Sequence, residues 1–308
     1  MAAHRLVQTF LCLLALACAL PAAARAQFPL EKKIGELAAE AGAETVAVAL
    51  YDLEKGHYFF HNPDDTFHAA STMKVAVMME LYRQAHERRL SLDRLVPVKN
   101  EFKSIADGSP FSVSASDDSE QTLYKKVGST ETVRELMRLM ITESSNLATN
   151  ILIELVTPER VRELADGMGA KGVKVLRGVE DSKAFERGMS NTTTARGLYV
   201  LLRAVAERRA VSREASEEME RVLLAQKFKE GLPAGLPAGF RVAHKTGSIT
   251  RISHDAGIVY PPGRKPYVLV VLTRGVADGA RARRLIADIS RAAYEDMTRL
   301  NLIAPPAR

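Results

Sequence analysis

The sequence predicts an α+β fold in which one antiparallel five-stranded sheet is flanked by the terminal helices and joined to an all-helical lobe. Two β-rich runs lie near the amino end, three more lie near the carboxyl end, and helical patterns fill the chain between them. Strands from both ends of a chain can join one antiparallel sheet, whereas a strict alternation of strands and helices would indicate a parallel sheet. The order of elements therefore predicts segregated α and β regions.

The amino terminus has the pattern of an export signal. A short polar and basic start precedes a mostly apolar run over residues 6–20, and Ala24-Arg25-Ala26 offers a small-residue cleavage site. The apolar run is short for a membrane span, but an uncleaved anchor and a lipid anchor on Cys18 stay open as alternatives. We therefore expect a signal peptide over residues 1–26, a mature domain over residues 27–308, and a periplasmic or secreted protein.

The composition is that of a globular protein with a mild positive charge. Hydrophobic residues make up 46% of the chain and charged residues 26%, which is ordinary for a domain with a core. Cys12 and Cys18 both lie in the predicted signal peptide, so its removal would leave neither a disulfide nor a thiol nucleophile. Its removal also takes Arg5 and Arg25, which changes the net charge from +6 to +4. No basic stripe with interleaved aromatic residues is present, so we expect no nucleic-acid partner. The clustered arginines are interpreted as solvated helix faces: Arg203, Arg208, Arg209, Arg281, Arg283 and Arg284.

The first part of the chain predicts a helix, a strand pair and a second helix. Apolar residues spaced three and four apart predict a helix over residues 30–41. The β-branched and apolar runs at 45–51 and 56–60 predict two paired strands. A helical pattern follows over residues 72–88. Residues 103–126 are rich in Ser, Asp and Gly, and they predict an extended surface insertion.

The middle of the chain predicts helices almost throughout. Five helical patterns follow one another, over residues 131–141, 146–156, 158–167, 193–208 and 212–226. Residues 178–191 lack periodicity and predict a loop. We assign residues 71–225 to the helical lobe.

The carboxyl-terminal part returns to strands. A turn-rich connection at 231–237 precedes them. Three strands are predicted over residues 240–245, 256–260 and 267–273, and a final amphipathic helix over residues 280–300. We assign residues 27–70 and 226–308 to an α/β lobe.

Ser71 and Lys74 are one helical turn apart at the start of a predicted helix. Side chains at i and i+3 lie on the same helix face, so the hydroxyl can come within reach of the amine. A serine becomes a good nucleophile when a base takes its proton, and a lysine can be that base once burial or a second cation such as Lys245 lowers its pKa. A capping serine and a surface lysine are the alternative. The apolar run at 75–79 argues against it, because a central helix would bury Lys74.

Ser144 and Asn146 lie where a loop turns into the helix predicted over residues 146–156. Ser144 could relay a proton toward a leaving group, and Asn146 could hydrogen-bond a substrate amide. An ordinary amino-terminal helix cap is the alternative, because Ser and Asn are favoured there.

Lys245-Thr246-Gly247-Ser248 continues a predicted strand. A glycine within a strand often marks close approach of a ligand to the backbone. The Ser248 N–H could then be a second oxyanion donor beside the Ser71 N–H, while Lys245 and Thr246 hold a substrate carboxylate. An ordinary edge strand that carries a lysine is the alternative.

In this order and over this length, the motifs resemble those of the class A β-lactamase-like serine hydrolases, which are penicillin-recognising serine enzymes. The resemblance covers nearly all of the mature chain. The segments that carry it are residues 68–74, 144–150, 191–195, 242–248 and 254–261. It implies a β-lactamase/transpeptidase-like fold and an acyl-enzyme mechanism. The roles that it implies are Ser71 as nucleophile, Lys74 as its base partner, Ser144 in proton relay, Asn146, Lys245 and Thr246 in substrate binding, and the amides of Ser71 and Ser248 as the oxyanion hole.

The chain departs from the family pattern in three places. Ser145 stands where the family usually has Asp, and the insertion at 103–126 is long enough to rim the cleft. The family's deacylating Glu has an Asn four residues further on. Glu180 and Glu186 are the candidates for that carboxylate, and neither has the Asn partner. A loop ion pair between Glu180 and Arg177 is the alternative, so the sequence leaves the deacylation rate open.

We therefore expect a secreted serine hydrolase, a β-lactamase, that opens β-lactam rings through an acyl-enzyme on Ser71. The alternatives are a D-Ala-D-Ala peptidase or esterase of the same fold with slow β-lactam deacylation, and a non-catalytic penicillin-binding sensor domain. No cofactor or metal is expected, because no His-Glu-x-x-His run occurs and His57 and His61 are interpreted as exposed strand residues. The expected partner is a β-lactam or a peptidoglycan-like small molecule, and the expected state is a monomer without a membrane span after signal cleavage. Arg251 is either a further ligand for a substrate carboxylate or a solvent-facing arginine.

Overall fold

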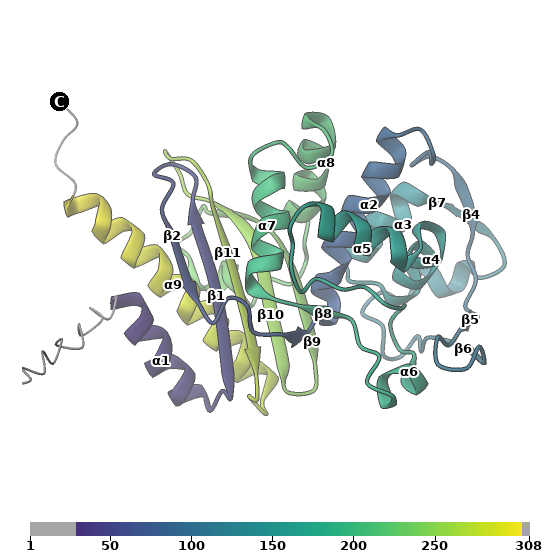
Figure 1. Cartoon of the computed structure of the whole chain (residues 1–308), viewed down its shortest axis with the longest axis horizontal. Coiled ribbons are helices and arrows are strands. Elements are labelled where there is room, and N and C mark those ends of the chain that lie inside the picture. The colour runs from purple at the N-terminus through teal and green to yellow at the C-terminus, as the bar shows by residue number, and fades with distance from the viewer. Residues whose placement is uncertain (1–28, 304–308) are drawn as a thin grey trace, which may run out of the picture.

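A five-stranded antiparallel sheet forms the centre of the structure (Figure 1). In the order in which they lie side by side, its strands are β2 (Tyr58–His61), β1 (Thr45–Asp52), β11 (Tyr267–Arg274), β10 (Ile252–Tyr260) and β9 (Arg241–Ile249). Every neighbouring pair is antiparallel. The two amino-terminal strands thus join the three carboxyl-terminal strands, which confirms the predicted fold class.

The computed structural model describes residues 29–303. The predicted signal peptide, its cleavage site and the alternative lipid anchor on Cys18 lie outside the described residues, as do residues 304–308. Within the described range, no helix combines the length and apolar composition needed to cross a bilayer.

One face of the sheet is covered by the first and last helices, α1 (Pro29–Ala41) and α9 (Gly279–Ile303), which pack against each other (Figure 1). Successive side chains of a strand point to opposite faces. Val46 and Val48 of β1 accordingly belong to the cluster beneath these helices, whereas Ala47 and Ala49 belong to the core on the other side. The terminal helices therefore flank the sheet as predicted.

The opposite face of the sheet is covered by α7 (Ala195–Ala206), which contacts β1 and β11. Beyond it lie the other helices of the middle region, α2 (Lys74–His86), α3 (Val133–Thr142), α4 (Asn146–Val156), α5 (Pro158–Gly167) and α8 (Arg213–Leu224). The first nine residues of α2, from Lys74 to Tyr82, are all buried. A helix that is buried on every side lies in the core of its lobe. Lys74 is therefore an interior residue.

Several elements differ from the sequence prediction. The helix predicted from residue 72 begins with a 3₁₀ turn, η1 (Ala70–Met73), before α2. The predicted loop at 178–191 contains a short helix, α6 (Ser182–Glu186), in which Asp181 caps the N–H of Ala184. The connection at 231–237 contains η3 (Leu232–Gly235). A five-residue helix is too short to show a helical period, which is why the sequence pattern missed α6.

The insertion at 103–126 is partly interior, although the sequence predicted a surface segment. It contains a small hairpin of β5 (Phe102–Lys103) and β6 (Pro110–Phe111), and it ends in η2 (Leu123–Lys126). Ser104, Asp118 and Glu120 are buried within it. Two further strand pairs are formed. The pair of β3 (Phe67–His68) with β8 (Thr192–Thr193) joins the two lobes, and the pair of β4 (Leu95–Pro97) with β7 (Thr130–Thr132) lies within the helical lobe.

Candidate active site

Ser71 lies in η1, at the amino end of the central helix α2. The residue before it, Ala70, has φ +45°, a left-handed conformation that is strained for a residue with a Cβ. The Ala70 N–H donates to His68 Nδ1 at 3.0 Å, and this bond helps to hold the turn. The backbone that presents Ser71 is therefore held in its conformation by the surrounding structure.

Gly247 brings strand β9 into contact with the backbone of η1. A Cβ atom at this position would lie 2.8 Å from the Ser71 nitrogen and 2.9 Å from the Thr72 nitrogen. The sequence predicted that this glycine admits a ligand, but its nearest neighbours are backbone atoms of the protein itself. Gly247 is needed because edge strand β9 and the segment that carries Ser71 touch at this point.

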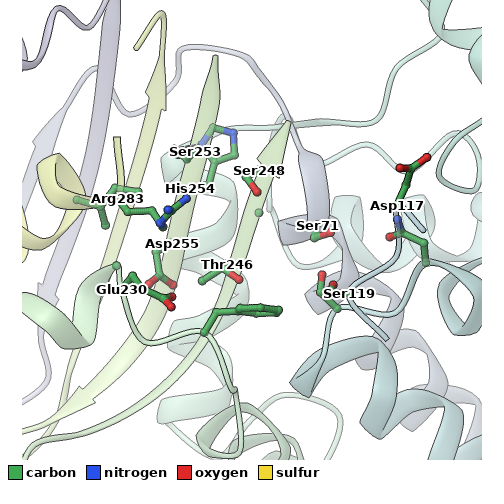
Figure 2. Close-up of a pocket in the computed structure, with 16 residues that line it drawn as sticks. Ser71, Asp117, Ser119, Glu230, Thr246, Ser248, Ser253, His254, Asp255 and Arg283 are labelled. Atoms are coloured by element: carbon green, nitrogen blue, oxygen red, sulfur yellow. Dashed lines mark hydrogen bonds between the residues drawn. The ribbon is translucent and has the colours of Figure 1, made fainter. Parts of the chain in front are cut away.

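Two lysines from distant parts of the chain converge on one hydroxyl. Lys74 Nζ lies 3.3 Å from Ser144 Oγ, and Lys245 Nζ lies 3.0 Å from the same atom. Both lysine side chains are completely buried. Ser144 and Ser71 line one cavity of about 370 Å³ together with Thr246 and Ser248. Figure 2 shows β9, with Thr246 and Ser248, facing Ser71 and Ser119 across the opening.

The surroundings of Lys74 and Lys245 favour the uncharged amine. Burial lowers the pKa of Lys74 to about 7, although the negative charges of Asp118 and Glu180 oppose this shift. Burial and the nearby charge of Lys74 lower the pKa of Lys245. Near neutral pH, Lys74 can therefore exist as an amine that accepts a proton.

The hydrogen bonds of Lys74 leave a path for that proton. Lys74 Nζ donates to the Ser144 carbonyl at 2.7 Å and to Asn146 Oδ1 at 3.0 Å. A neutral amine has two N–H groups and one lone pair, so with both N–H groups on these acceptors its lone pair faces Ser144 Oγ. Among the described residues, the Ser71 hydroxyl makes no hydrogen bond. The direct Ser71–Lys74 contact expected from their spacing is thus replaced by a Lys74–Ser144 contact.

The amino end of α4 is capped by Ser145, which accepts from the Ala148 N–H at 3.2 Å. The alternative reading of Ser144 and Asn146 as ordinary caps is therefore wrong. Ser144 adopts a left-handed backbone with φ +60°. Asn146 bridges the amine of Lys74 and the carboxyl group of Glu180, because its Oδ1 accepts from Lys74 and its Nδ2 donates to Glu180 Oε1 at 2.7 Å.

Glu180 is the carboxylate of the loop that shares a cavity with Ser71. It lines a second cavity, of about 430 Å³, that also contains Ser71, Asn146 and Ser248. Its Oε2 accepts from the Ser114 N–H of the insertion at 3.0 Å. Its backbone has φ +62°, so it too is held in a strained conformation.

The other loop candidates lie elsewhere. Arg177 donates to the carbonyls of Met189 and Gly178, and no ion pair joins it to Glu180 in the described structure. Glu186 is exposed at the end of α6 and lines neither cavity. The position four residues after Glu180 is the buried Ala184, which offers no amide.

The cleft contains residues that the sequence did not indicate. Asp117 and Ser119 of the insertion, Phe228, Glu230 and Arg283 all line the cavity with Ser71. In Figure 2, Glu230, Asp255 and Arg283 gather on the far side of β9 from Ser71. Arg283 was interpreted as part of a solvated helix face; it is exposed, but it faces this cavity. No local pattern could have singled it out, because its neighbours come from other parts of the chain.

Arg251 and His244 each pair with a carboxylate. Arg251 forms an exposed ion pair with Glu44 at 2.6 Å and lines neither cavity, so its suggested role toward a substrate carboxylate is not supported. His244 forms a buried pair with Asp255, Nδ1 to Oδ1 at 2.8 Å. Over residues 29–303, no three His, Cys, Asp or Glu side chains gather as a metal site.

Residues 29–297 match the β-lactamase enzyme family. The chain is 25% identical over 291 residues to the extended-spectrum β-lactamase PER-1 of Pseudomonas aeruginosa. The aligned region covers 91% of this chain and 92% of PER-1. It is 27% identical over 273 residues to a β-lactamase of Streptomyces albus G, with 87% and 84% covered.

Solved structures show the same relationship. A β-lactamase from Sphaerobacter thermophilus superposes with a TM-score of 0.73 at 26% identity and covers 90% of this chain and 98% of that one. The structure titled PBP-A has a TM-score of 0.75 at 24% identity, with 88% and 96% covered, and so supports the fold alone.

Proposed function

Because the chain belongs to the β-lactamase enzyme family, we propose that it is a serine hydrolase that opens β-lactam rings through an acyl-enzyme on Ser71. The observation that carries the proposal is the convergence of two buried lysines on the Ser144 hydroxyl, in the cavity that also holds Ser71. A lysine with a lowered pKa replaces the histidine that other serine hydrolases use as the base.

Acylation can be assigned step by step. When substrate is bound, the lone pair of Lys74 turns from Ser144 Oγ to Ser71 Oγ. Ser71 Oγ then attacks the lactam carbonyl and loses its proton to the neutral amine of Lys74, and the N–H groups of Ser71 and Ser248 stabilise the oxyanion. The C–N bond of the ring then breaks. Ser144, which lies between the two lysines, donates its proton to the leaving nitrogen and is reprotonated by Lys74. This return of the proton makes the amine of Lys74 neutral again.

Substrate binding uses the opposite wall of the cleft. Lys245 Nζ donates to Ser144 Oγ and to the Thr246 carbonyl. A substrate carboxylate beside this amine would oppose the effect of burial and favour the ammonium, which has a third N–H for that ligand. We assign Lys245 and the Thr246 hydroxyl to the substrate carboxylate, with Arg283 at the far end of the same cavity as a further cation. Asn146 uses one amide hydrogen on Glu180 and has a second for the substrate's acyl amide.

We assign deacylation to Glu180. A carboxylate can accept about four hydrogen bonds, and Glu180 accepts two in the described structure, from Asn146 and from the Ser114 N–H. The remaining lone pairs can position a water molecule beside the acylated Ser71. Ala184 stands where the family has an amide, so this water has one protein partner fewer. That feature favours slow deacylation, and it supports a D-Ala-D-Ala peptidase or esterase as the second candidate.

Intact mass tests the proposal. The mature protein incubated with benzylpenicillin should gain the mass of one penicillin, and Ser71→Ala should gain nothing. Turnover of nitrocefin then separates the candidates, because a β-lactamase releases product repeatedly, whereas a peptidase or esterase holds a long-lived adduct. If wild-type protein neither forms an adduct nor hydrolyses nitrocefin, or if the adduct persists in Ser71→Ala, the proposed function is wrong.

We also propose that the enzyme is exported as a monomer to the periplasm or the medium. The export pattern of residues 1–26 supports this location, and β-lactams meet bacterial cells from outside. Amino-terminal sequencing of the secreted protein should start at Gln27, and an intact leader would contradict cleavage.

A further inference from the structure

Asp118 places a buried carboxylate at the amino end of α4, although it belongs to the insertion at 103–126. Its Oδ2 accepts from the backbone N–H groups of Asn146 at 2.8 Å and Leu147 at 3.0 Å. The Tyr124 hydroxyl donates to the same oxygen at 2.9 Å. Asp118 is only 4% exposed. It is therefore the group that satisfies the first free donors of this helix.

This carboxylate lies beside the motif position at which the chain lacks an acidic residue. The middle residue of Ser144-Ser145-Asn146 is a serine where the family pattern has an acid. Ser145 Oγ lies 3.4 Å from Asp118 Oδ2, so the two side chains touch. The negative charge is thus present at the motif but comes from another segment of the chain.

We propose that Asp118 is a positioning residue for acylation: its carboxylate takes the role of the acid that the motif lacks and holds Ser144 and Asn146 against Lys74. The inference rests on the proposed function. It gives a role in acylation to the insertion, which the family pattern does not require.

The hydrogen bonds explain how one carboxylate acts on the reacting groups. Asp118 fixes the backbone of Asn146, and the side chain of Asn146 in turn bonds to Lys74 and Glu180. Asp118 and Tyr124 both belong to the insertion, and the Tyr124 hydroxyl holds the carboxylate that binds the amino end of α4. The insertion and α4 therefore cannot shift independently. A displacement of about 1 Å in such a group slows an enzyme by roughly 100-fold.

Asp118 also acts through its charge. Its carboxylate raises the pKa of Lys74 and opposes the effect of burial. If Asp118 became neutral, the pKa of Lys74 would fall further, and Lys74 would be an uncharged base at lower pH. A residue that only stabilises the fold would not move this pH dependence.

The first test measures the rate constant of acylation by benzylpenicillin against pH, from quenched samples analysed by intact mass. Asp118→Asn keeps the side-chain shape and removes the charge, and its acid limb should lie at lower pH than that of wild type. Glu101→Gln makes the same chemical change at an exposed position just before the insertion and should leave the limb in place. An acid limb of Asp118→Asn that coincides with wild type overturns the proposal.

The second test moves the carboxylate. Asp118→Ser should slow acylation by about tenfold or more, and adding Ser145→Asp to it should recover most of that loss. Absence of recovery in the double variant would show that position 145 cannot replace Asp118, and the proposal would be wrong. Normal acylation of wild type with unaffected Asp118 variants defeats this inference alone, whereas a wild-type protein that neither forms an adduct nor hydrolyses nitrocefin defeats the proposed function.

Discussion

Burial sets the protonation state of Lys74 near neutral pH. An exposed lysine is charged at neutral pH and has no lone pair for a proton, whereas burial lowers the pKa of Lys74 to about 7. The base form is therefore available near neutral pH. The two N–H groups of this amine have carbonyl acceptors, so its lone pair is directed toward Ser144 rather than toward either carbonyl.

The first prediction concerns the protonation of Lys74. Acylation by benzylpenicillin should increase as the pH rises through about 7, because the amine must lose its proton to act as the base. Lys74→Arg keeps a positive charge that cannot be lost, and it should slow acylation roughly 10²- to 10⁴-fold. Lys125→Arg, at an exposed position of the insertion, is the matched control. A normal rate in Lys74→Arg would exclude Lys74 as the base.

The second prediction separates the two steps of turnover at Glu180. At a pH well above 7, where Lys74 is neutral in both proteins, Glu180→Gln should form the acyl-enzyme at the wild-type rate. It should release the acyl group about 100-fold more slowly, because a neutral amide does not activate water. Glu186→Gln is the matched control, since Glu186 is exposed and lines neither cavity. Adduct lifetime by intact mass is the measurement. An unchanged lifetime in Glu180→Gln would remove Glu180 from the mechanism.

Residues of the candidate site could be identified from the sequence where they belong to a short motif. Ser71 and Lys74 share one helical turn, and Lys245 follows a recognisable strand, so local spacing was sufficient. Asp118 and Arg283 were not predictable in this way. Each reaches the cleft only because the fold brings a distant segment to it, and neither has a neighbour in the sequence that marks its role.

At the scale of elements, the site depends on the contact between β9 and η1. Strand β9 is the edge of the sheet, so its free side faces the helical lobe. Gly247 allows β9 to approach η1 closely, and this approach sets Ser248 beside Ser71. The geometry of the proposed oxyanion hole is thus a property of two elements together.

The third prediction follows from that contact. Gly247→Ala would place a Cβ atom 2.8 Å from the Ser71 nitrogen, so β9 must move away from η1. Acylation should fall by about 100-fold, and overpacking should lower the free energy of unfolding by about 1–3 kcal/mol. Penicillin acylation and urea unfolding are the measurements. Gly35→Ala in α1, where a Cβ atom has open space, is the control and should keep full activity. Normal acylation in Gly247→Ala would show that the contact does not matter.

Element prediction succeeded where the hydrophobic period was long and failed where polar contacts decide the structure. Helix α4 and helix α5 agree with their predicted ranges, because each has a continuous apolar face. The insertion was predicted as surface from its Ser, Asp and Gly content. Its buried Asp118 and Glu120 are instead held by hydrogen bonds to backbone N–H groups, which composition does not reveal.

At the scale of the whole molecule, the sheet joins the two ends of the chain (Figure 1). The cavity that holds Ser71 is lined by residues of β9 and of the helical lobe. The order of elements was enough to predict one antiparallel sheet, because each strand region could pair with the other in only a few ways. The strand order and the packing of α7 on the sheet were not predictable, since they depend on which faces fit together. The buried polar residues along the cleft are held by this same packing.

His254 connects three segments of the sheet region and is the basis of the fourth prediction. Its Nε2 lies 2.9 Å from the His68 carbonyl, and its Nδ1 lies 2.8 Å from the Ser253 carbonyl and 3.3 Å from the Thr273 nitrogen. The two carbonyls favour a charged ring, but burial outweighs them. Burial lowers the pKa of His254 to about 4. The unfolded chain then binds more protons than the folded protein between about pH 6.5 and pH 4.

The free energy of unfolding should therefore decrease as the pH falls through this interval, with a contribution from His254 of about 3 kcal/mol by pH 4. His254→Gln retains an N–H donor for the His68 carbonyl and cannot become charged, so it should lose about that much less stability on acidification. Denaturant unfolding at about pH 7 and about pH 4 measures the difference. His57→Gln removes a histidine from an exposed position and should follow the wild type. Equal acid sensitivity in His254→Gln and wild type would show that the neutral ring of His254 is not what limits stability in acid.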